Sequence, residues 1–290
     1  MKTLTSIVLA LAVAVPAAAQ RQVDETRPAV RDGIISLSVR AGSVRVEGWN
    51  RNEVHVKGTL ERGVDRLRLE SEGRHTRIEA VADDDCRRCR VDLVIQVPAA
   101  SRMEVRTVSA SLEVAALTGA LDAQTVSGRV RVSDTPAALR VETVSGAVSL
   151  ETGTTPVDAR SVSGSITVRS RASSVEATTV SGRLDVESGD LYRGTFHSVS
   201  GAMQLAVGVV PQGRVDVESV SGAVTLSLLP SIAADFHVST LGGTIDNAFG
   251  VKAERTSDFV PGLELTFSMG GGGGRIAVQT FTGSIYLEKR

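Results

Sequence analysis

The side chains that most often carry chemistry are few in this 290-residue sequence, and they are scattered. The four histidines, His55, His75, His197 and His237, stand at unrelated positions, which favours surface roles over a shared site. No G-x-S-x-G motif is present, and a nucleophilic serine also needs a histidine and an acid beside it. The acidic residues of the middle of the chain alternate with valine, which predicts a solvated face rather than paired catalytic carboxylates. We therefore predict no catalytic residue and no cofactor.

Cys86 and Cys89, in the stretch DDDCRRCR, are the only cysteines. In an exported protein such a pair predicts a small disulfide loop. A redox-active C-x-x-C motif normally opens a helix in a βαβ unit, and strand signals follow here instead. A metal site would need two further ligands, and no nearby Cys or His pair supplies them. The pair is thus a disulfide candidate, and redox activity is the less favoured alternative.

The dominant feature is a repeat of about eighteen residues, seen in TVSGAVSL at 143–150 and again in SVSGSITV at 161–168. We call the residue before Ser-Gly the anchor of each copy. Successive anchors lie 18 residues apart at first, then 19 to 21, and the last step of 40 is about two periods. The anchors are Val108, Val126, Val144, Val162, Val180, Val199, Val220, Leu241 and Phe281.

Apolar residues also recur five and three residues before the anchor and four and six residues after it. This alternation has the period of a β-strand, and the phase slip beside the glycine predicts a corner between two short strands. Four or five inward apolar side chains per copy are expected from these columns and the anchor. The corner glycines are Gly128, Gly146, Gly164, Gly182, Gly201, Gly222, Gly243 and Gly283.

One such copy is too small to bury its apolar face alone, but stacked copies bury it together. We predict an all-β fold, a parallel β-solenoid of the β-helix or β-roll type with 18–21 residues per coil and right-handed winding. Val130, Val148 and Ile166 are expected to lie stacked in its interior. A left-handed hexapeptide helix stays open as an alternative, because eighteen is three times six. A calcium-binding nonapeptide roll is disfavoured, because the G-G-x-G-x-D turns are missing.

Two columns of hydroxyls flank the anchor, and we predict a ladder that either stabilises the corner or binds a partner. The column before the anchor is expected to point inward, where its hydroxyls need hydrogen-bond partners. Its members include Thr107, Thr125, Thr143, Ser161 and Thr179. The column after the anchor contains Ser127, Ser145, Ser163, Ser181, Ser200 and Ser221.

The remaining segments are assigned from composition and pattern. Residues 1–19 predict a secretory signal peptide cleaved near Ala19, so the chain is expected to be exported to the periplasm or the extracellular space, with no transmembrane segment in the mature protein. Residues 20–32 are expected to be flexible, 33–100 to form β-rich opening coils or a cap, and 101–290 to form the regular repeat domain. A degenerate copy is expected around Phe259, and the C-terminal SIYLEKR is expected to protect a terminal strand edge.

The repeated T-V-S-G-x-V-x-V copies, preceded by VDLVIQVP at 91–98, resemble a family of exported bacterial proteins of unknown function that carries an adhesin label. The resemblance covers most of the mature chain and implies the repeat fold, and it brings no catalytic residues to carry over. The opening SVRVEGWNRNEVHVKG also resembles that family's start.

The net charge of −1 gives no electrostatic reason to expect a nucleic-acid partner. Our leading hypothesis is a non-enzymatic cell-envelope protein, an adhesin-like binding or scaffold module that uses the lateral face of the solenoid to hold an envelope polymer or protein. A carbohydrate-active enzyme on a β-helix is the second hypothesis, and an envelope-stress sensor or regulatory partner is the third.

Overall fold

The protein is described by a computed structural model that covers residues 21–61, 63–82, 86, 89–134, 136–257 and 261–290. All regular secondary structure among these residues consists of β-strands, which confirms the all-β expectation. The strands form one mixed sheet in which most pairings are parallel. The predicted signal peptide, 1–19, lies outside the described residues.

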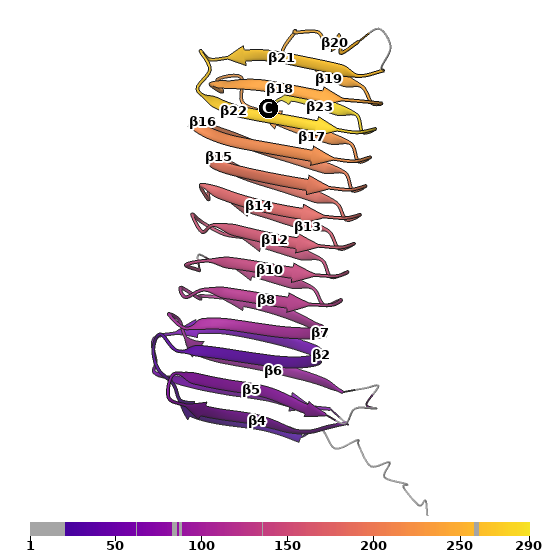
Figure 1. The fold of residues 1–290 in the computed structure, drawn as a ribbon. Coiled ribbons are helices and arrows are strands. Elements are labelled where there is room, and N and C mark those ends of the chain that lie inside the picture. Colours follow the sequence, from indigo (N-terminus) through magenta and orange to yellow (C-terminus); the bar gives the residue numbers. More distant parts are fainter. Residues whose placement is uncertain (1–20, 62, 83–85, 87–88, 135, 258–260) are drawn as a thin grey trace, which may run out of the picture.

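In the middle of the chain the repeat folds into two stacks of parallel strands (Figure 1). The first stack holds the strand before each anchor, and the second holds the strand after it. Three longer strands pass through the corner or the return turn and contribute to both stacks. The first-stack strands are β8 (Leu121–Thr125), β10 (Leu139–Thr143), β12 (Val157–Ser161) and β14 (Ser174–Thr179). The second-stack strands are β9 (Val130–Ser133), β11 (Val148–Glu151), β13 (Ile166–Ser170) and β17 (Val224–Leu228), and the long strands are β7 (Arg102–Ala115), β15 (Leu184–Ser198) and β16 (Met203–Ser219).

The interior columns lie where the pattern predicts them. Val148 pairs with Val130 on one side and with Ile166 on the other, so each copy is in register with the next. All three side chains are buried, at 0–2% exposure. Burying an aliphatic side chain of this size stabilises the fold by about 1.5–3 kcal/mol, and the same gain recurs in every copy.

The anchor column differs from the prediction, because its side chains point to solvent. All nine anchors are between 38% and 57% exposed. The residue before the anchor takes the inward position instead, as buried Thr143 does beside exposed Val144. Two consecutive residues, the anchor and the serine after it, then face outward at the corner. The alternation of inward and outward side chains is therefore interrupted between the anchor and the serine, one position later than the sequence pattern suggested.

Each corner brings the backbones of neighbouring copies close together, and this explains the glycine column. A Cβ atom on Gly146 would overlap the carbonyl oxygen of Gly128, and one on Gly164 would overlap that of Gly146. The reason for glycine here is the close approach along the stack and not a positive φ angle.

The C-terminal strands do not follow sequence order. β22 (Gly274–Thr280) lies between β16 and β18 (Ala234–Thr240), and β23 (Ile285–Lys289) lies between β17 and β19 (Ile245–Asn247). The copy anchored at Phe281 is therefore inserted between those anchored at Val220 and Leu241. The C-terminal SIYLEKR is thus not at a terminal edge, contrary to expectation, because β23 has a parallel neighbour on each side.

The described strands between the copies anchored at Leu241 and Phe281 pair antiparallel and do not form the degenerate copy expected there. β21 (Leu263–Met269) pairs antiparallel with β18, and the short β20 (Glu254–Arg255) pairs antiparallel with β21. Phe259, around which a copy was expected, lies outside the described residues. Leu263 and Leu265 thus belong to a returning strand that covers the end of the first stack (Figure 1).

The N-terminal section closes the other end in a similar way. β2 (Ile34–Trp49) pairs in parallel with β7, with Gly42 beside Ala110 and Val44 beside Leu112, so it is a true copy of the repeat. The other strands of this section are β1 (Arg21–Pro28), β3 (Glu53–Leu60), β4 (Val64–Glu72), β5 (His75–Ala82) and β6 (Arg90–Pro98). β5 and β6 pair in parallel with β2, and the antiparallel pairs β4–β5, β3–β6 and β1–β3 lie beyond it. Arg21–Pro28, predicted to be flexible, is thus a strand paired with β3.

Candidate functional site

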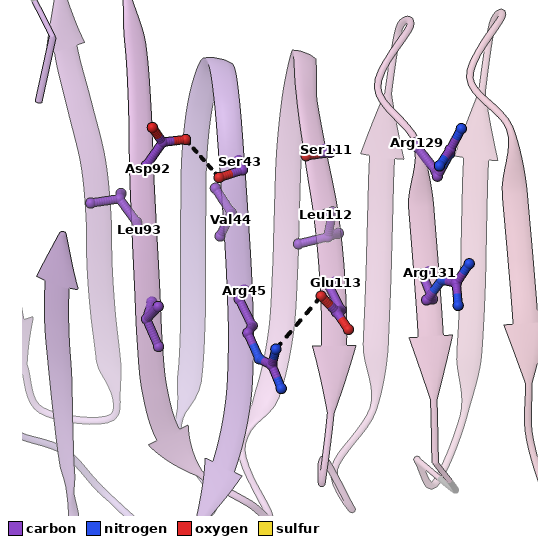
Figure 2. A pocket seen from close by; sticks show the side chains of 11 residues that line it. Ser43, Val44, Arg45, Asp92, Leu93, Ser111, Leu112, Glu113, Arg129 and Arg131 are labelled. Atoms are coloured by element: carbon purple, nitrogen blue, oxygen red, sulfur yellow. Dashed lines mark hydrogen bonds and ion pairs between the residues drawn. The ribbon is translucent and has the colours of Figure 1, made fainter. Parts of the chain in front are cut away.

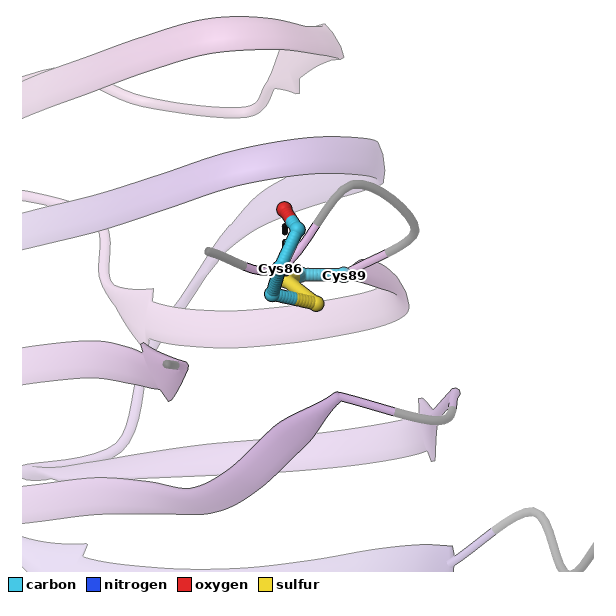
Figure 3. Close-up of a disulfide and its surroundings, with 2 residues drawn as sticks. All are labelled: Cys86 and Cys89. Atoms are coloured by element: carbon cyan, nitrogen blue, oxygen red, sulfur yellow. Dashed lines mark hydrogen bonds between the residues drawn. A yellow bond between two sulfur atoms is a disulfide. The ribbon is translucent and has the colours of Figure 1, made fainter. Parts of the chain in front are cut away.

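The two cysteines form a disulfide with each other at the edge of the N-terminal section (Figure 3). Both cysteines lie in the connection between β5 and β6, just before β6 begins, so the disulfide closes a short loop there. Cys89 is buried and Cys86 is partly buried against the core. Among the described residues next to this pair, the chain continues into strand β6 (Arg90–Pro98), and no helix of the kind that opens a redox-active C-x-x-C motif is seen there.

The hydroxyl column before the anchor is buried and hydrogen-bonded to the corner. The N–H of Gly146 donates to Thr143 Oγ1 at 2.9 Å, and the same bond recurs in most copies. Hydroxyls of adjacent copies also meet, as where Thr107 donates to Thr125 at 2.9 Å. Ser161 Oγ is the exception, buried without a hydrogen bond. This column closes the corner turns.

The serine column after the anchor is exposed, but its hydroxyls are engaged. Ser145 Oγ donates to the carbonyl of Val126 at 3.3 Å, which ties one copy to the copy before it. The same bond is made by Ser127, Ser163, Ser181, Ser200 and Ser221. Each of these hydroxyls donates its proton to a backbone carbonyl, so in this structure none donates it to a histidine base.

Charged side chains on the outer face of the first stack pair with one another. Arg140 bonds Glu142 at 2.7 Å, and Arg160 bonds Glu176 at 2.8 Å. Asp158 lies between the two arginines, 3.0 Å from Arg160 Nε, and burial raises the pKa of its carboxyl. Within the described residues no three His, Cys, Asp or Glu side chains converge as metal ligands would.

The outer face of the second stack carries a groove of about 580 Å³ (Figure 2). Four neighbouring strands build it, in the order β6, β2, β7 and β9. Strand pairing sets Asp92 beside Ser43 and Arg45 beside Glu113, and it sets Glu113 beside Arg131. The parallel register therefore gathers on one face residues that are far apart in the chain.

Within the groove most charges are matched. Ser43 donates to Asp92 at 2.6 Å, and Arg45 bonds Glu47 at 2.7 Å and approaches Glu113 at 4.0 Å. Arg129 and Arg131 are different, because neither forms an ion pair within the described part of the chain. Both are exposed, and Figure 2 shows both on the same side of β9.

The surroundings of this arginine pair leave room for a ligand. On the far side of β9 the next strand presents the short Ser149 beside Arg131. Side chains two residues apart on a strand are separated by about 6–7 Å, so two guanidinium groups stand close together. Guanidinium groups bind carboxylates and phosphates through paired hydrogen bonds. The groove is therefore suited to holding oxyanions. Its two serines, Ser43 and Ser111, donate their protons to Asp92 and to the carbonyl of Gly42.

Sequence reasoning missed this groove. Arg129 and Arg131 occupy ordinary outward positions of the repeat, and only their contrast with the small residues at the same positions of the next copy, Ala147 and Ser149, marks them. The partners contributed by β2 and β6 were beyond reach, because their place beside β7 depends on long-range pairing.

No family model matches the chain, and no curated protein does. Three solved structures are similar in outline. They are a "putative adhesin" of Bacteroides fragilis (11% identity, TM-score 0.45, covering 94% of this chain and 99% of that one), a "putative lipid binding protein" of Parabacteroides distasonis (14%, 0.40, 92% and 96%) and a "putative adhesin" of the same organism (12%, 0.38, 93% and 98%). At these values neither fold nor function is inferred from them. No helix among the described residues is suited to crossing a bilayer.

Proposed function

We propose that this chain is an exported β-solenoid module of the cell envelope that binds a partner on its lateral face and carries out no catalysis. The in-register parallel stacks support the solenoid, and the signal-peptide pattern of residues 1–19 supports export. The resemblance of the T-V-S-G-x-V-x-V copies to exported adhesin-like proteins points the same way.

The observation that carries the binding role is the arginine pair in the groove. Two like charges side by side repel each other, and an ordinary protein surface intersperses the two signs, as the first stack does. Arg129 and Arg131 have no described ion pair, although Glu113 stands on the adjacent strand. An oxyanion bound between them would relieve that repulsion. The partner is therefore an envelope polymer or protein that presents carboxylate or phosphate groups.

The engagement of the exposed serines argues against a hydrolytic role. Their protons are donated to backbone carbonyls, and the carboxylates of the first stack are tied to arginines. These hydroxyls and carboxylates are thus already engaged in contacts with the protein itself. Release of reducing ends from a polysaccharide panel, lost on changing one carboxylate, would replace this proposal with the enzyme hypothesis.

The test is retention of the mature protein on isolated envelope fractions, and on polygalacturonate and polyphosphate as carboxylate and phosphate probes. Arg129→Gln with Arg131→Gln should lower retention about tenfold or more, because hydrogen bonds to charged groups contribute about 1.5–3 kcal/mol each. Arg140→Gln with Arg160→Gln removes the same charge from the other face and should leave retention unchanged. Equal retention by both double variants would contradict the binding site.

A further inference from the structure

The exposed anchors form a continuous apolar stripe along the molecule. In spatial order it runs through Val108, Val126, Val144, Val162, Val180, Val199, Val220, Phe281 and Leu241. Backbone hydrogen bonds hold neighbouring members side by side, as Val144 N–H donates to Thr125 O at 3.3 Å and Phe281 N–H donates to Ser219 O at 3.0 Å. Nine exposed apolar side chains in one line are more than the single ones that every surface carries.

The stripe is free of charge at every position. The anchor is apolar in all nine of these copies, and the outward residue after it is serine, threonine or, after Leu241, glycine. In the copy formed by β2, Arg40 takes the anchor position beside Val108, so the apolar stripe ends there. Depletion of charge at a flat apolar patch is a property of the buried centre of protein interfaces. In the C-terminal half the stripe also borders a groove of about 480 Å³ lined by Val180, His197, Val199, Val220 and Phe281, which could receive side chains of a partner.

Several kinds of partner fit this stripe poorly. A lipid surface is usually bound by Trp, Phe and Leu together with Lys and Arg, whereas seven of the nine members here are valine. An extended peptide adds to a sheet edge, and the stripe lies on corners whose backbone groups are already paired. Aromatic residues make up only 3% of the chain, and Phe281 is the one aromatic member, which disfavours a sugar held by ring stacking.

We propose that the stripe is covered by the stripe of a second copy of this chain. Its members repeat at the spacing of parallel strands, about 4.8 Å, and a partner must share that spacing to contact every member at once. A second copy has the same spacing by construction. Valine side chains of one copy then pack between those of the other along the whole line, in a two-fold symmetric pair.

The size of the stripe sets the expected strength. Nine members about 4.8 Å apart make a strip roughly 40 Å long. Across the strip, three residues of each copy at about 3.3 Å per residue give a width of roughly 10 Å. The resulting area, on the order of 400 Å² per copy, is below the roughly 800 Å² per partner of a standard stable interface. We therefore expect a reversible, concentration-dependent dimer with a Kd in the micromolar range or weaker.

Sedimentation equilibrium of the mature protein over a dilution series tests this proposal independently of the groove. The unchanged protein should pass from monomer to dimer as concentration rises. Val162→Asp with Val180→Asp, at the centre of the stripe, should weaken association at least tenfold. Leu229→Asp with Val251→Asp changes two aliphatic residues of similar exposure off the stripe and should dimerise as before. Circular dichroism establishes that each variant is folded.

Crosslinking supplies a second readout that needs no disruptive change. Val180→Cys, the middle member of the stripe, should give a disulfide-linked dimer under mild oxidation, because the middle members meet in either orientation of the pair. Val108→Cys should crosslink only if the copies run parallel. A protein that stays monomeric at its highest attainable concentration, or a Val180→Cys variant that gives no crosslink, overturns the proposal. Neither result would affect retention through Arg129 and Arg131.

Discussion

The middle of the molecule and its two ends solve the same stacking problem in different ways. In the middle, each strand pairs with the equivalent strand of the next copy, eighteen residues away, and every pairing is parallel. At the ends, the chain leaves the repeat and returns. β2 pairs with β7 across a long insertion, and β22 and β23 enter between earlier copies.

The difference shows how a periodic fold ends. A simple stack would present open strand edges, which invite pairing with other molecules. Here antiparallel strands close the first stack, β4 at one end and β21 at the other, and β1 closes the second stack at the N-terminal end. The repeat therefore provides the core, and the departures from it provide the edges.

The largest expected effect comes from the corners of the middle region. Gly164→Ala should destabilise the protein by about 3 kcal/mol or more, because the new Cβ overlaps the carbonyl oxygen of Gly146 and the stacked backbones must move apart. Gly189→Ala is the matched control, because its Cβ would meet only Arg171 Cα, at 4.0 Å. Thermal and denaturant unfolding measure both. Similar unfolding midpoints for the two variants would contradict the close approach of the Gly146 and Gly164 backbones.

The second prediction tests the order of the C-terminal strands. Ile285→Ala should cost about 2–4 kcal/mol, since Ile285 is fully buried between β17 and β19. Leu263→Ala, in the partly exposed strand β21, should cost clearly less. If the chain were stacked in sequence order, Ile285 would lie at the end of its stack, and the two changes would have similar effects on the unfolding midpoint.

The third prediction separates members of the inner hydroxyl column. Thr143→Val leaves the buried N–H of Gly146 without its acceptor and should cost about 1–2 kcal/mol. Ser161→Ala removes a hydroxyl that has no hydrogen bond, so its cost should be smaller. Urea unfolding of the two variants compares them, and an equal loss of stability would mean that Ser161 has a partner.

The smallest effect concerns Asp158. Burial raises the pKa of its carboxyl above 3.8, so the folded protein binds that proton more readily than the unfolded chain. The stabilisation from this proton is complete below pH 3.8 and is lost as the pH rises through the folded pKa. Asp158→Asn should therefore gain stability relative to the unchanged protein near neutral pH, and the gain should shrink in acid. Stability curves of both proteins against pH measure it, and a gain that grows in acid would contradict the raised pKa.

The sequence predicted the stacked interior because one physical signal, apolar alternation interrupted by glycine, repeats often enough to align. Val130, Val148 and Ile166 lie where it places them. The anchor was misplaced because apolar character usually indicates burial, and only the corner geometry turns valine outward. The insertion of β22 and β23 was not predictable from spacing, because repeat copies carry no signal of which neighbour each one selects.

The candidate site was still harder to predict. The disulfide candidates were recognisable from two cysteines alone. The groove depends on strands β6, β2, β7 and β9 lying side by side, and no local pattern records that order.

Cysteine pairs placed on the anchor column test most directly that the copies stack in register and that the Phe281 copy is inserted. Adjacent stacked positions lie within the Cα separation of about 4.4–6.8 Å that a disulfide allows, and positions two copies apart do not. Val220→Cys with Phe281→Cys should therefore form an intramolecular disulfide, identified by peptide mapping at high dilution. Val220→Cys with Leu241→Cys should not. The reverse result, a bond from 220 to 241 and none to 281, would contradict the account.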